Sequence, residues 1–460
     1  MHKSLKYFLL TIFFLALAFL LFSYLPFYEC LSIALFMLVS YKLMAEINQN
    51  LSIKNLIAFI AVLQWLIGAI LGYEYMDRIQ AEYLMRIPRD QYFSFVFPAT
   101  LAMLAGLYLI PTRGSSGDLL LSLSGKKLFR KGLILVLIGF VSGFFPQLGF
   151  AGYLLASLRY VGLFYIFLSG HWSRNIWLVV IFGSLVFFSF GYGLFHELLL
   201  WGTFFMMVYY ISKNSSLFFR LSTITAGFLL LLALQVSKQD IRDVAWNGNI
   251  PASQRAVMSL KMLTGRVTGE EKLFSDEVIP NLVVRINQGW IISAIMDYIP
   301  AEKDFVRGET VRESFEAAIY PRFLKKDKAK SGGQRNMLLY AGITLNQNTS
   351  MDISQVGEAW ANYGMWGGIL MMFCMGLFMG VVFWIIELRA LKNPELILWI
   401  PFLFLQVVKA ETSLVTMLNH IVKAALITWF FFLPPTQYLL SPMWDEPGED
   451  ESPANTAPAE

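Results

Sequence analysis

Five ionisable residues fall inside long apolar stretches of the chain, where charge is expensive and usually marks function. They are Arg159, His196, Glu197, His420 and Lys423. His420 and Lys423 are three positions apart and share one helical face, whereas the adjacent His196 and Glu197 point about 100° apart on a helix. These side chains either pair with one another and stabilise a helical bundle or line a polar cavity that binds a charged ligand.

A second group of charges lies in a long polar region of the sequence. Its basic residues are Arg322, Lys325, Lys326, Lys328, Lys330 and Arg335, against the single acid Asp327. The local net charge is therefore six minus one, or +5. Such a segment is either a solvated connector or a site for an anion such as a phosphate or diphosphate, which arginine binds through two parallel hydrogen bonds.

A third group of polar residues runs directly into an apolar stretch that begins near residue 365. Glu358 and Asn362 are four positions apart, so a helix places both on one face, and polar groups beside apolar surface suggest a functional role. Ser350 or Asp352 is suited to cap this short helix. Gly364 and the glycines after it permit a sharp re-entry into the membrane and close helix packing.

The elements that position these residues are expected to be transmembrane helices. Hydrophobic residues make up 57% of the sequence and charged residues 15%, far from the roughly 25% charged residues of a soluble domain. Apolar runs long enough to span a bilayer occur near residues 5–24, 27–44, 55–74, 92–111, 131–145, 149–169, 175–191, 193–211, 218–236, 365–386, 396–411 and 413–434. We therefore expect an all-α polytopic membrane protein with about twelve transmembrane helices.

Lysine and arginine set the expected orientation, because short cytoplasmic loops carry the positive excess. Alternate loops on one side hold fourteen of these residues and the other short loops hold four. Both termini are therefore expected in the cytoplasm. The first apolar run lacks a small-residue cleavage site and is expected to remain as a span.

This topology divides the chain into four regions. They are helices 1–9 in residues 1–237, one large outer loop in residues 238–363, helices 10–12 in residues 364–434 and an acidic tail in residues 435–460 whose composition predicts disorder. Within the loop, the apolar spacing of residues 281–299 predicts an amphipathic helix able to lie in the membrane interface, with Arg285 near its start. A further helix is expected from Thr310 to Pro321.

The composition argues against several classes of function. Cys30 and Cys374 both lie in apolar stretches, and the four histidines have no metal-ligand spacing, so we expect neither a disulfide framework nor a metal site. The net charge of +4 is small and dispersed, which gives a nucleic-acid partner no electrostatic footprint.

The loop and its exit into the tenth expected helix resemble the bacterial oligosaccharide repeat-unit polymerases, the Wzy-type polymerases of O-antigen and exopolysaccharide. A family-like PR-x-L-x-x-x-K element corresponds to Pro321-Arg322 through Lys328, and a T-S…G-E-A-x-x-N-x-G-x-x-G element corresponds to Thr349-Ser350 through Gly357-Glu358-Ala359, Asn362, Gly364 and Gly367. The arrangement of many spans around one large loop also matches. The chain departs from the pattern at Lys325-Lys326, where such enzymes often have an aromatic residue and a proline, and in having only three spans after the loop.

The resemblance implies a GT-C-like, cofactor-independent glycosyltransferase on the periplasmic face of the bacterial inner membrane. It would move a growing glycan from undecaprenyl diphosphate onto the terminal sugar of a lipid-linked repeat unit, among membrane lipids and with a chain-length regulator protein as a further partner. The acceptor hydroxyl would attack the anomeric carbon while guanidinium groups stabilise the departing diphosphate.

Roles for the candidate residues follow from this implied reaction. Glu358, or alternatively His196, would activate the acceptor, and Arg322 and Arg285 would bind the diphosphate with support from Arg159. Contacts to diphosphate or glycan are further expected from Arg335, Lys328, Asn362, Glu197, His420 and Lys423. The outer loop has no D-x-D motif, and basic residues can replace a metal as the counter-charge, so metal independence is expected.

Three other readings remain open. A ligase of the O-antigen type would transfer a finished glycan to another acceptor by similar chemistry. A transporter or lipid flippase would line a path with the same polar residues, although the sequence shows no repeat between its halves. A passive scaffold would not need charges at membrane depth.

Overall fold

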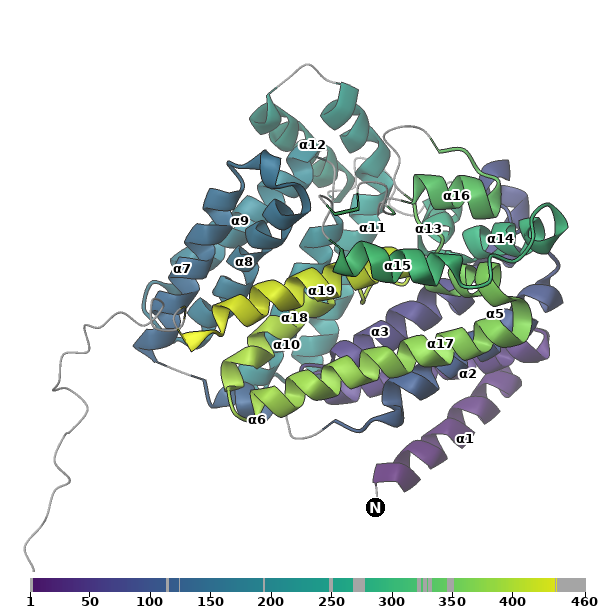
Figure 1. Ribbon diagram of the computed structural model, residues 1–460, viewed down its shortest axis with the longest axis horizontal. Coiled ribbons are helices and arrows are strands. Elements are labelled where there is room, and N and C mark those ends of the chain that lie inside the picture. The colour runs from purple at the N-terminus through teal and green to yellow at the C-terminus, as the bar shows by residue number, and fades with distance from the viewer. Residues whose placement is uncertain are drawn as a thin grey trace, which may run out of the picture.

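The computed structural model describes residues 3–112, 116–123, 125–192, 195–247, 251–267, 278–320, 324–325, 329, 333–345, 351–434 and 436. These residues form an all-helical protein, and no strand occurs among them. Figure 1 shows a bundle of long helices with a group of shorter helices along its upper side.

Seven helical segments among the described residues are long and apolar enough to cross a membrane. They are α2 (Phe27–Glu46), the continuous segment α3 (Ile53–Val62), η1 (Leu63–Ile67) and α4 (Gly68–Glu74), then α5 (Arg89–Leu109), α8 (Gly149–Leu168), α9 (Arg174–Tyr192), α17 (Gln355–Ala390) and α19 (Leu414–Phe431). Shorter apolar helices occupy Lys6–Leu21, Leu217–Leu230 and Pro394–Phe404. The chain is therefore a helical membrane protein.

A helix is present at each of the twelve expected spans. The other helices at these positions are α1 (Lys3–Leu21), α7 (Lys126–Ser142), α10 (His196–Lys213), α11 (Leu217–Asn247) and the pair η5 (Pro394–Trp399) and α18 (Ile400–Phe404). Seven of the helical segments are long and apolar enough to span a membrane. The total of twelve transmembrane helices therefore stays a prediction. The helix α11 also continues ten residues past the expected boundary at residue 237.

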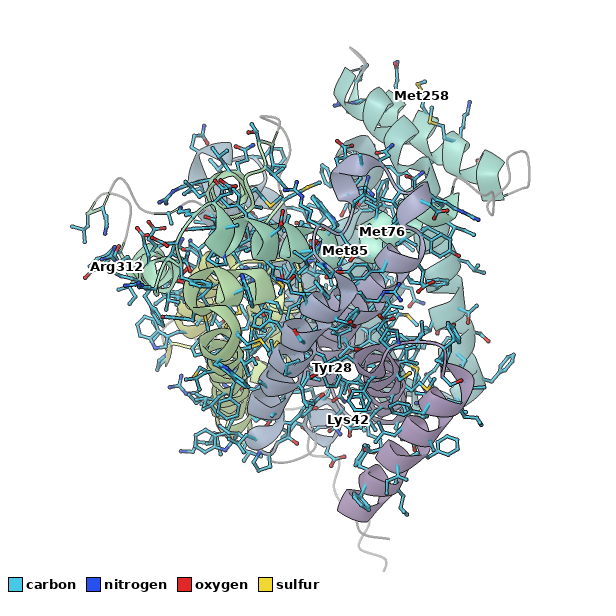
Figure 2. All side chains as sticks on the ribbon, turned by 90° about the vertical axis from the view of Figure 1, so that its right-hand side faces the viewer. Tyr28, Lys42, Met76, Met85, Met258 and Arg312 are labelled. Carbon is cyan, nitrogen blue, oxygen red and sulfur yellow. The ribbon has the colours of Figure 1, made fainter. Side chains whose placement is uncertain are left out.

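Short helices of the expected loop form what we call the cap. They are α12 (Ala252–Val267), α13 (Val278–Ile286), α14 (Gly289–Ala301), α15 (Glu309–Ile319) and α16 (Gln334–Ala341). In Figure 2, Met258 of α12 and Arg312 of α15 lie in the upper half of the molecule with Met76 and Met85, whereas Lys42 of α2 lies toward the lower end. The cap therefore shares one end of the bundle with the short connection between α4 and α5.

The single amphipathic helix expected over residues 281–299 is instead two helices, α13 and α14. The break falls at Asn287, whose Oδ1 accepts a hydrogen bond from the Gly289 amide at 2.7 Å, while the Gln288 amide donates to the Gln64 carbonyl at 3.1 Å. The helix α14 is also not an interfacial helix, since Trp290 to Met296 are all buried in the main core. Tertiary contacts to the membrane helix around Gln64 override the sequence periodicity here.

The long helix α17 bends where its glycines predicted a re-entry. Gly364 has φ +62° and ψ −147°, a conformation that is almost restricted to glycine. Below the bend, α17 packs closely against α5: a Cβ on Gly376 would lie 2.0 Å from the Met103 carbonyl oxygen, and one on Gly106 would lie 2.3 Å from the Phe373 carbonyl oxygen. Small residues at this crossing let the two backbones touch, as is common between membrane helices.

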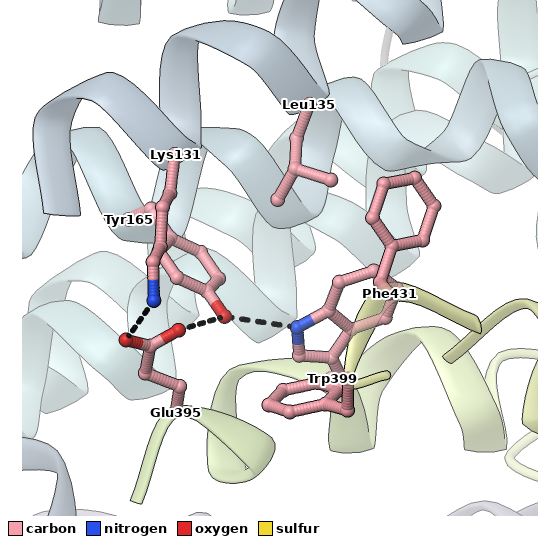
Figure 3. Close-up of a pocket in the computed structure, with 7 residues that line it drawn as sticks. Lys131, Leu135, Tyr165, Glu395, Trp399 and Phe431 are labelled. Carbon is pink, nitrogen blue, oxygen red and sulfur yellow. Dashed lines mark hydrogen bonds and ion pairs between the residues drawn. The ribbon is translucent and has the colours of Figure 1, made fainter. Parts of the chain in front are cut away.

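A partly buried chain of polar side chains joins α7, α8 and η5 (Figure 3). Lys131 Nζ lies 2.7 Å from Glu395 Oε1, and Tyr165 donates from its hydroxyl to Glu395 Oε2 at 3.2 Å. Trp399 Nε1 in turn donates to the Tyr165 hydroxyl at 3.0 Å. These contacts join α7, α8 and η5, and they lie in a small pocket walled by Leu135 and Phe431.

Candidate functional site

Arg159 lies in the middle of α8 and is largely surrounded by aromatic rings. Its guanidinium carbon lies 4.8 Å from the centre of the Tyr160 ring, and the rings of Phe140 and Phe188 lie 5.7 and 5.5 Å away. Its terminal nitrogen donates to the Tyr160 hydroxyl at 2.8 Å, while its buried Nε has no hydrogen-bond partner. A guanidinium held this way keeps donor capacity for an anionic group.

Glu197 and His196 begin α10 and face the segment 405–413 that connects α18 to α19. The Tyr153 hydroxyl of α8 accepts a hydrogen bond from Gln406 Nε2 at 3.4 Å and interacts electrostatically with Glu197, and Lys409 interacts electrostatically with Glu197 and Glu411. His196 Nδ1 lies 3.9 Å from Glu411 Oε1, and both side chains remain partly exposed at 44% and 42%. The two neighbours therefore have different partners, as their angular separation on a helix predicts.

His420 and Lys423 lie on α19 and also have different partners. His420 is fully buried, its Nε2 lies 2.8 Å from the Phe402 carbonyl oxygen, and its Nδ1 has no hydrogen-bond partner. Lys423 Nζ donates to Asn419 Oδ1 at 2.6 Å and lies 5.0 Å from the centre of the Phe150 ring. Phe150 also contacts His420 edge-on, so one aromatic side chain at the start of α8 lies against both residues.

These residues form what we call the outer polar cluster. It consists of Tyr153, Arg159, Tyr160, His196, Glu197, Gln406, Lys409, Glu411, His420 and Lys423. Electrostatic contact between Glu197 and Tyr160 links the start of α10 to the Arg159 pair. The five membrane-depth residues expected from sequence therefore lie on three elements, α8, α10 and α19, that interact with one another or with the segment 405–413.

Glu358 and Asn362 share one face of α17, as expected, and that face points at the cap and at α19. Glu358 is 1% exposed, and its Oε2 accepts a hydrogen bond from the Leu414 amide at 2.6 Å. Asn362 donates to Thr310 Oγ1 at 2.7 Å and accepts from the Gly308 amide at 2.9 Å. In this conformation both side chains hold α15 and α19 together.

Asp352 has a role that differs from the one expected. It was a candidate cap for the helix that carries Glu358, but the N-cap position of α17 is Ser354, which makes no side-chain capping bond. Asp352 Oδ2 instead accepts hydrogen bonds from the Ser413 amide at 3.0 Å, the Ser413 hydroxyl at 2.5 Å and the Thr416 hydroxyl at 3.1 Å. It therefore caps α19, where a carboxylate also complements the helix dipole.

The basic residues of the cap lie apart from the outer polar cluster where they are described. Arg335 forms two hydrogen bonds with the Glu313 carboxylate, at 3.0 and 3.1 Å, and this partner raises the pKa of the arginine. Arg285 is exposed near the end of α13. Arg322 and Lys328 lie outside the described residues, as do Thr349 and Ser350.

Lys409, Glu411 and the residues that bind them were not identified as candidate site residues from the sequence. The rule that flagged Arg159 applies equally to Lys409 and Glu411, which close the apolar run 396–411. Tyr153 and Gln406 had no distinguishing signal, because their roles arise only when α8 meets the segment before α19. No group of three potential metal ligands occurs among the described residues.

Comparison with known proteins adds one finding. A family model described as "Domain of unknown function (DUF8712)" matches residues 66–388, which include Arg159, the start of α10, the cap and Glu358. Neither the curated proteins nor the solved structures give a match to the chain.

Proposed function

Because the chain belongs to this family of unknown function, we propose its activity from its own residues: it polymerises polyprenyl-diphosphate-linked oligosaccharide repeat units into a surface polysaccharide. The outer polar cluster is the single observation that carries the proposal. Charges of both signs meet there within an apolar bundle, and such charges mark substrate sites more often than structural pairs.

Arg159 supports the proposal because its guanidinium group can donate a further hydrogen bond. Its buried Nε lacks a partner, and its aromatic surroundings provide a low dielectric in which a guanidinium interacts strongly with a diphosphate. The acceptor oxygen forms a bond to the anomeric carbon, and the bond from that carbon to the diphosphate oxygen breaks. Arg159 then stabilises the charge that the leaving diphosphate acquires.

His196 is the better placed of the two candidates for activating the acceptor. It is 44% exposed and lies beside Glu411, so an acceptor hydroxyl can reach its ring and transfer a proton to it. Glu358 is buried and its carboxylate already accepts a hydrogen bond from the start of α19. We therefore assign Glu358 a positioning role, in which it sets the cap against the outer polar cluster.

The same proposal includes the finer topology. Twelve spans, with both termini in the cytoplasm and the cap in the periplasm, would bring the outer polar cluster to the face of the bacterial inner membrane where lipid-linked repeat units await polymerisation. The basic segment from Arg322 to Arg335 would then lie at that surface, where it supplies further counter-charge to the diphosphate.

The proposal is tested in a strain that lacks the protein and carries Arg159 variants. Arg159→Ala and Arg159→Lys should both shorten the surface polysaccharide, since lysine keeps the charge but loses the planar fork. Arg78→Ala is the matched control, because Arg78 is exposed in the connection between α4 and α5 and contacts only the Tyr75 ring among the interactions found for it. Polymer length is read on gels, with membrane insertion checked by immunoblot.

The products of the deletion strain separate the alternatives. Accumulation of single capped repeats supports a polymerase, whereas accumulation of long polyprenyl-linked chains indicates a ligase. Repeat units trapped on the cytoplasmic side would indicate a flippase. Unchanged glycan in the deletion strain would refute every one of these activities.

A further inference from the structure

The helix α15 has an exposed face that no part of the described structure covers. Phe315 is 49% exposed and Ile319 66% exposed, and they are followed by Tyr320 at 48% and Leu324 at 67%. Arg312 is exposed on the same side of the helix one turn before Phe315, and Figure 2 shows it projecting from the edge of the molecule. The exposed face therefore changes from charged to apolar along the helix.

The opposite face of α15 packs along the membrane helix α19, and the two helices are neighbours in Figure 1. The buried residues of this face are small: Thr310, Ser314, Ala317 and Ala318. Small residues permit close approach between helices. The packing is thus the kind found between helices in a membrane.

The direction of α15 follows from its first turn. Asn362 of α17 donates to Thr310 Oγ1 at the start of α15 at 2.7 Å, and Glu358, one turn earlier on α17, accepts from the Leu414 amide at the start of α19 at 2.6 Å. Since both starts bind the same turn of α17 and α15 packs along α19, the end of α15 must lie further along α19 than its start. The 11 residues of α15 advance about 16 Å at about 1.5 Å per residue.

The exposure of α19 agrees with this direction. No residue from Leu414 to Ala424 is exposed, whereas Leu426, Trp429 and Phe430 are 59%, 58% and 55% exposed. A membrane helix that is covered over its first three turns and open beyond them matches a partner helix that ends partway along it.

Aromatic residues mark the level at which α15 begins. The Tyr363 hydroxyl lies against Gly308, the residue before α15, and Trp366, just past the bend at Gly364, is 79% exposed. Exposed tryptophan and tyrosine gather at the boundary between lipid headgroups and acyl chains.

From these observations we infer that α15 is an amphipathic helix embedded in the interface of the leaflet on the cap side, with Arg312 among the lipid phosphates and Phe315, Ile319 and Tyr320 against the upper acyl chains, at a depth that keeps the charged residues of its other flank in contact with water. The ion pairs of Glu313 with Arg335 and of Glu316 with Lys325 then lie on the flank of α15 that faces the rest of the cap. The occupant of the exposed face is bilayer lipid. This inference holds whether or not the protein polymerises glycans.

Site-specific fluorescence tests the inference in the full-length protein. The chain has two cysteines, Cys30 and Cys374, which are replaced by serine before single cysteines are introduced at Ile319, with Tyr320→Cys as a second reporter. Leu426→Cys provides a lipid-exposed reference on α19, and Glu302→Cys a solvent-exposed reference on the cap. Each variant is labelled with an environment-sensitive maleimide and placed in vesicles of phosphatidylethanolamine and phosphatidylglycerol.

Doxyl-labelled lipid quenches probes that face the bilayer, whereas iodide quenches probes that face water. Probes at Ile319 and Tyr320 should show blue-shifted emission, strong quenching by doxyl-labelled lipid and little quenching by iodide, close to the Leu426 values. Iodide quenching as strong as at Glu302 would overturn the inference, because the helix would then face water. Protection from both quenchers would also overturn it, since the face would then be covered by protein such as a second copy of this chain.

Discussion

Removal of the Asp352 carboxylate is expected to destabilise the protein, because it removes hydrogen bonds that hold the start of α19. Three donors point at Oδ2 of this residue: the Ser413 amide at 3.0 Å, the Ser413 hydroxyl at 2.5 Å and the Thr416 hydroxyl at 3.1 Å. A hydrogen bond to a charged group contributes about 1.5–3 kcal/mol, and an N-cap replaced by alanine costs about 0.5–2 kcal/mol. Because the three bonds share one oxygen, their contributions overlap, and we expect Asp352→Ala to cost about 2–4 kcal/mol in total.

The conservative variant separates charge from geometry. Asp352→Asn keeps an oxygen that accepts the Ser413 amide but loses the charge, so it should cost about 1–2 kcal/mol. Thr416→Val removes a single bond and should cost about 1 kcal/mol. Asp77→Ala is the control, since Asp77 is exposed between α4 and α5, and its effect should stay within about 0.5 kcal/mol.

The measurement is equilibrium unfolding of the purified protein in mixed micelles with increasing SDS. The expected order of stability is control, Thr416→Val, Asp352→Asn and then Asp352→Ala. An Asp352→Ala variant as stable as Asp77→Ala would show that the capping bonds do not hold α19, and the assigned role of Asp352 would be wrong.

Three further predictions use the same unfolding assay. Lys131→Met should destabilise by about 1–3 kcal/mol, because it removes the cation beside the partly buried Glu395 carboxylate, whereas restored stability in Lys131→Met with Glu395→Gln would identify the charge as the cause. Gly364→Ala should cost at least about 1–3 kcal/mol, because alanine is strained at φ +62° and its Cβ would lie 3.0 Å from the Phe305 ring; a neutral effect would contradict the bend. Gly202→Ala, in open space on α10, should instead stabilise by about 0.4–1 kcal/mol.

The sequence predicted the membrane helices well because their signal is local. Long apolar runs need no tertiary information, and a helix is present at each of them. The bend at Gly364 was also expected from the glycine itself. Sidedness and the number of true spans depend on the bilayer, so the twelve-span topology stays a prediction.

The contacts of the candidate site were less predictable because they join residues far apart in the chain. Asp352 was expected to cap a neighbouring helix, yet it caps one that starts 62 residues later, at Leu414. The break between α13 and α14 depends on Gln64, more than two hundred residues upstream. The relation of Arg322 and Lys328 to Arg159 stays a prediction, since those two residues lie outside the described part of the chain.

The segment before α19 connects the cap to the outer polar cluster. Trp65 Nε1 donates to the Ala410 carbonyl at 3.1 Å, Asp352 binds Ser413, Glu358 binds Leu414 and His196 lies beside Glu411. Because these anchors come from three separate parts of the chain and bind within the five positions from Ala410 to Leu414, a shift of the cap relative to α17 must also move Glu411 and the ring that faces it. A loop that sits on the bundle as an independent domain would have no such coupling. The cap and the charged cluster therefore form one polar assembly, in which the position of the loop sets the geometry of the residues proposed to do the chemistry.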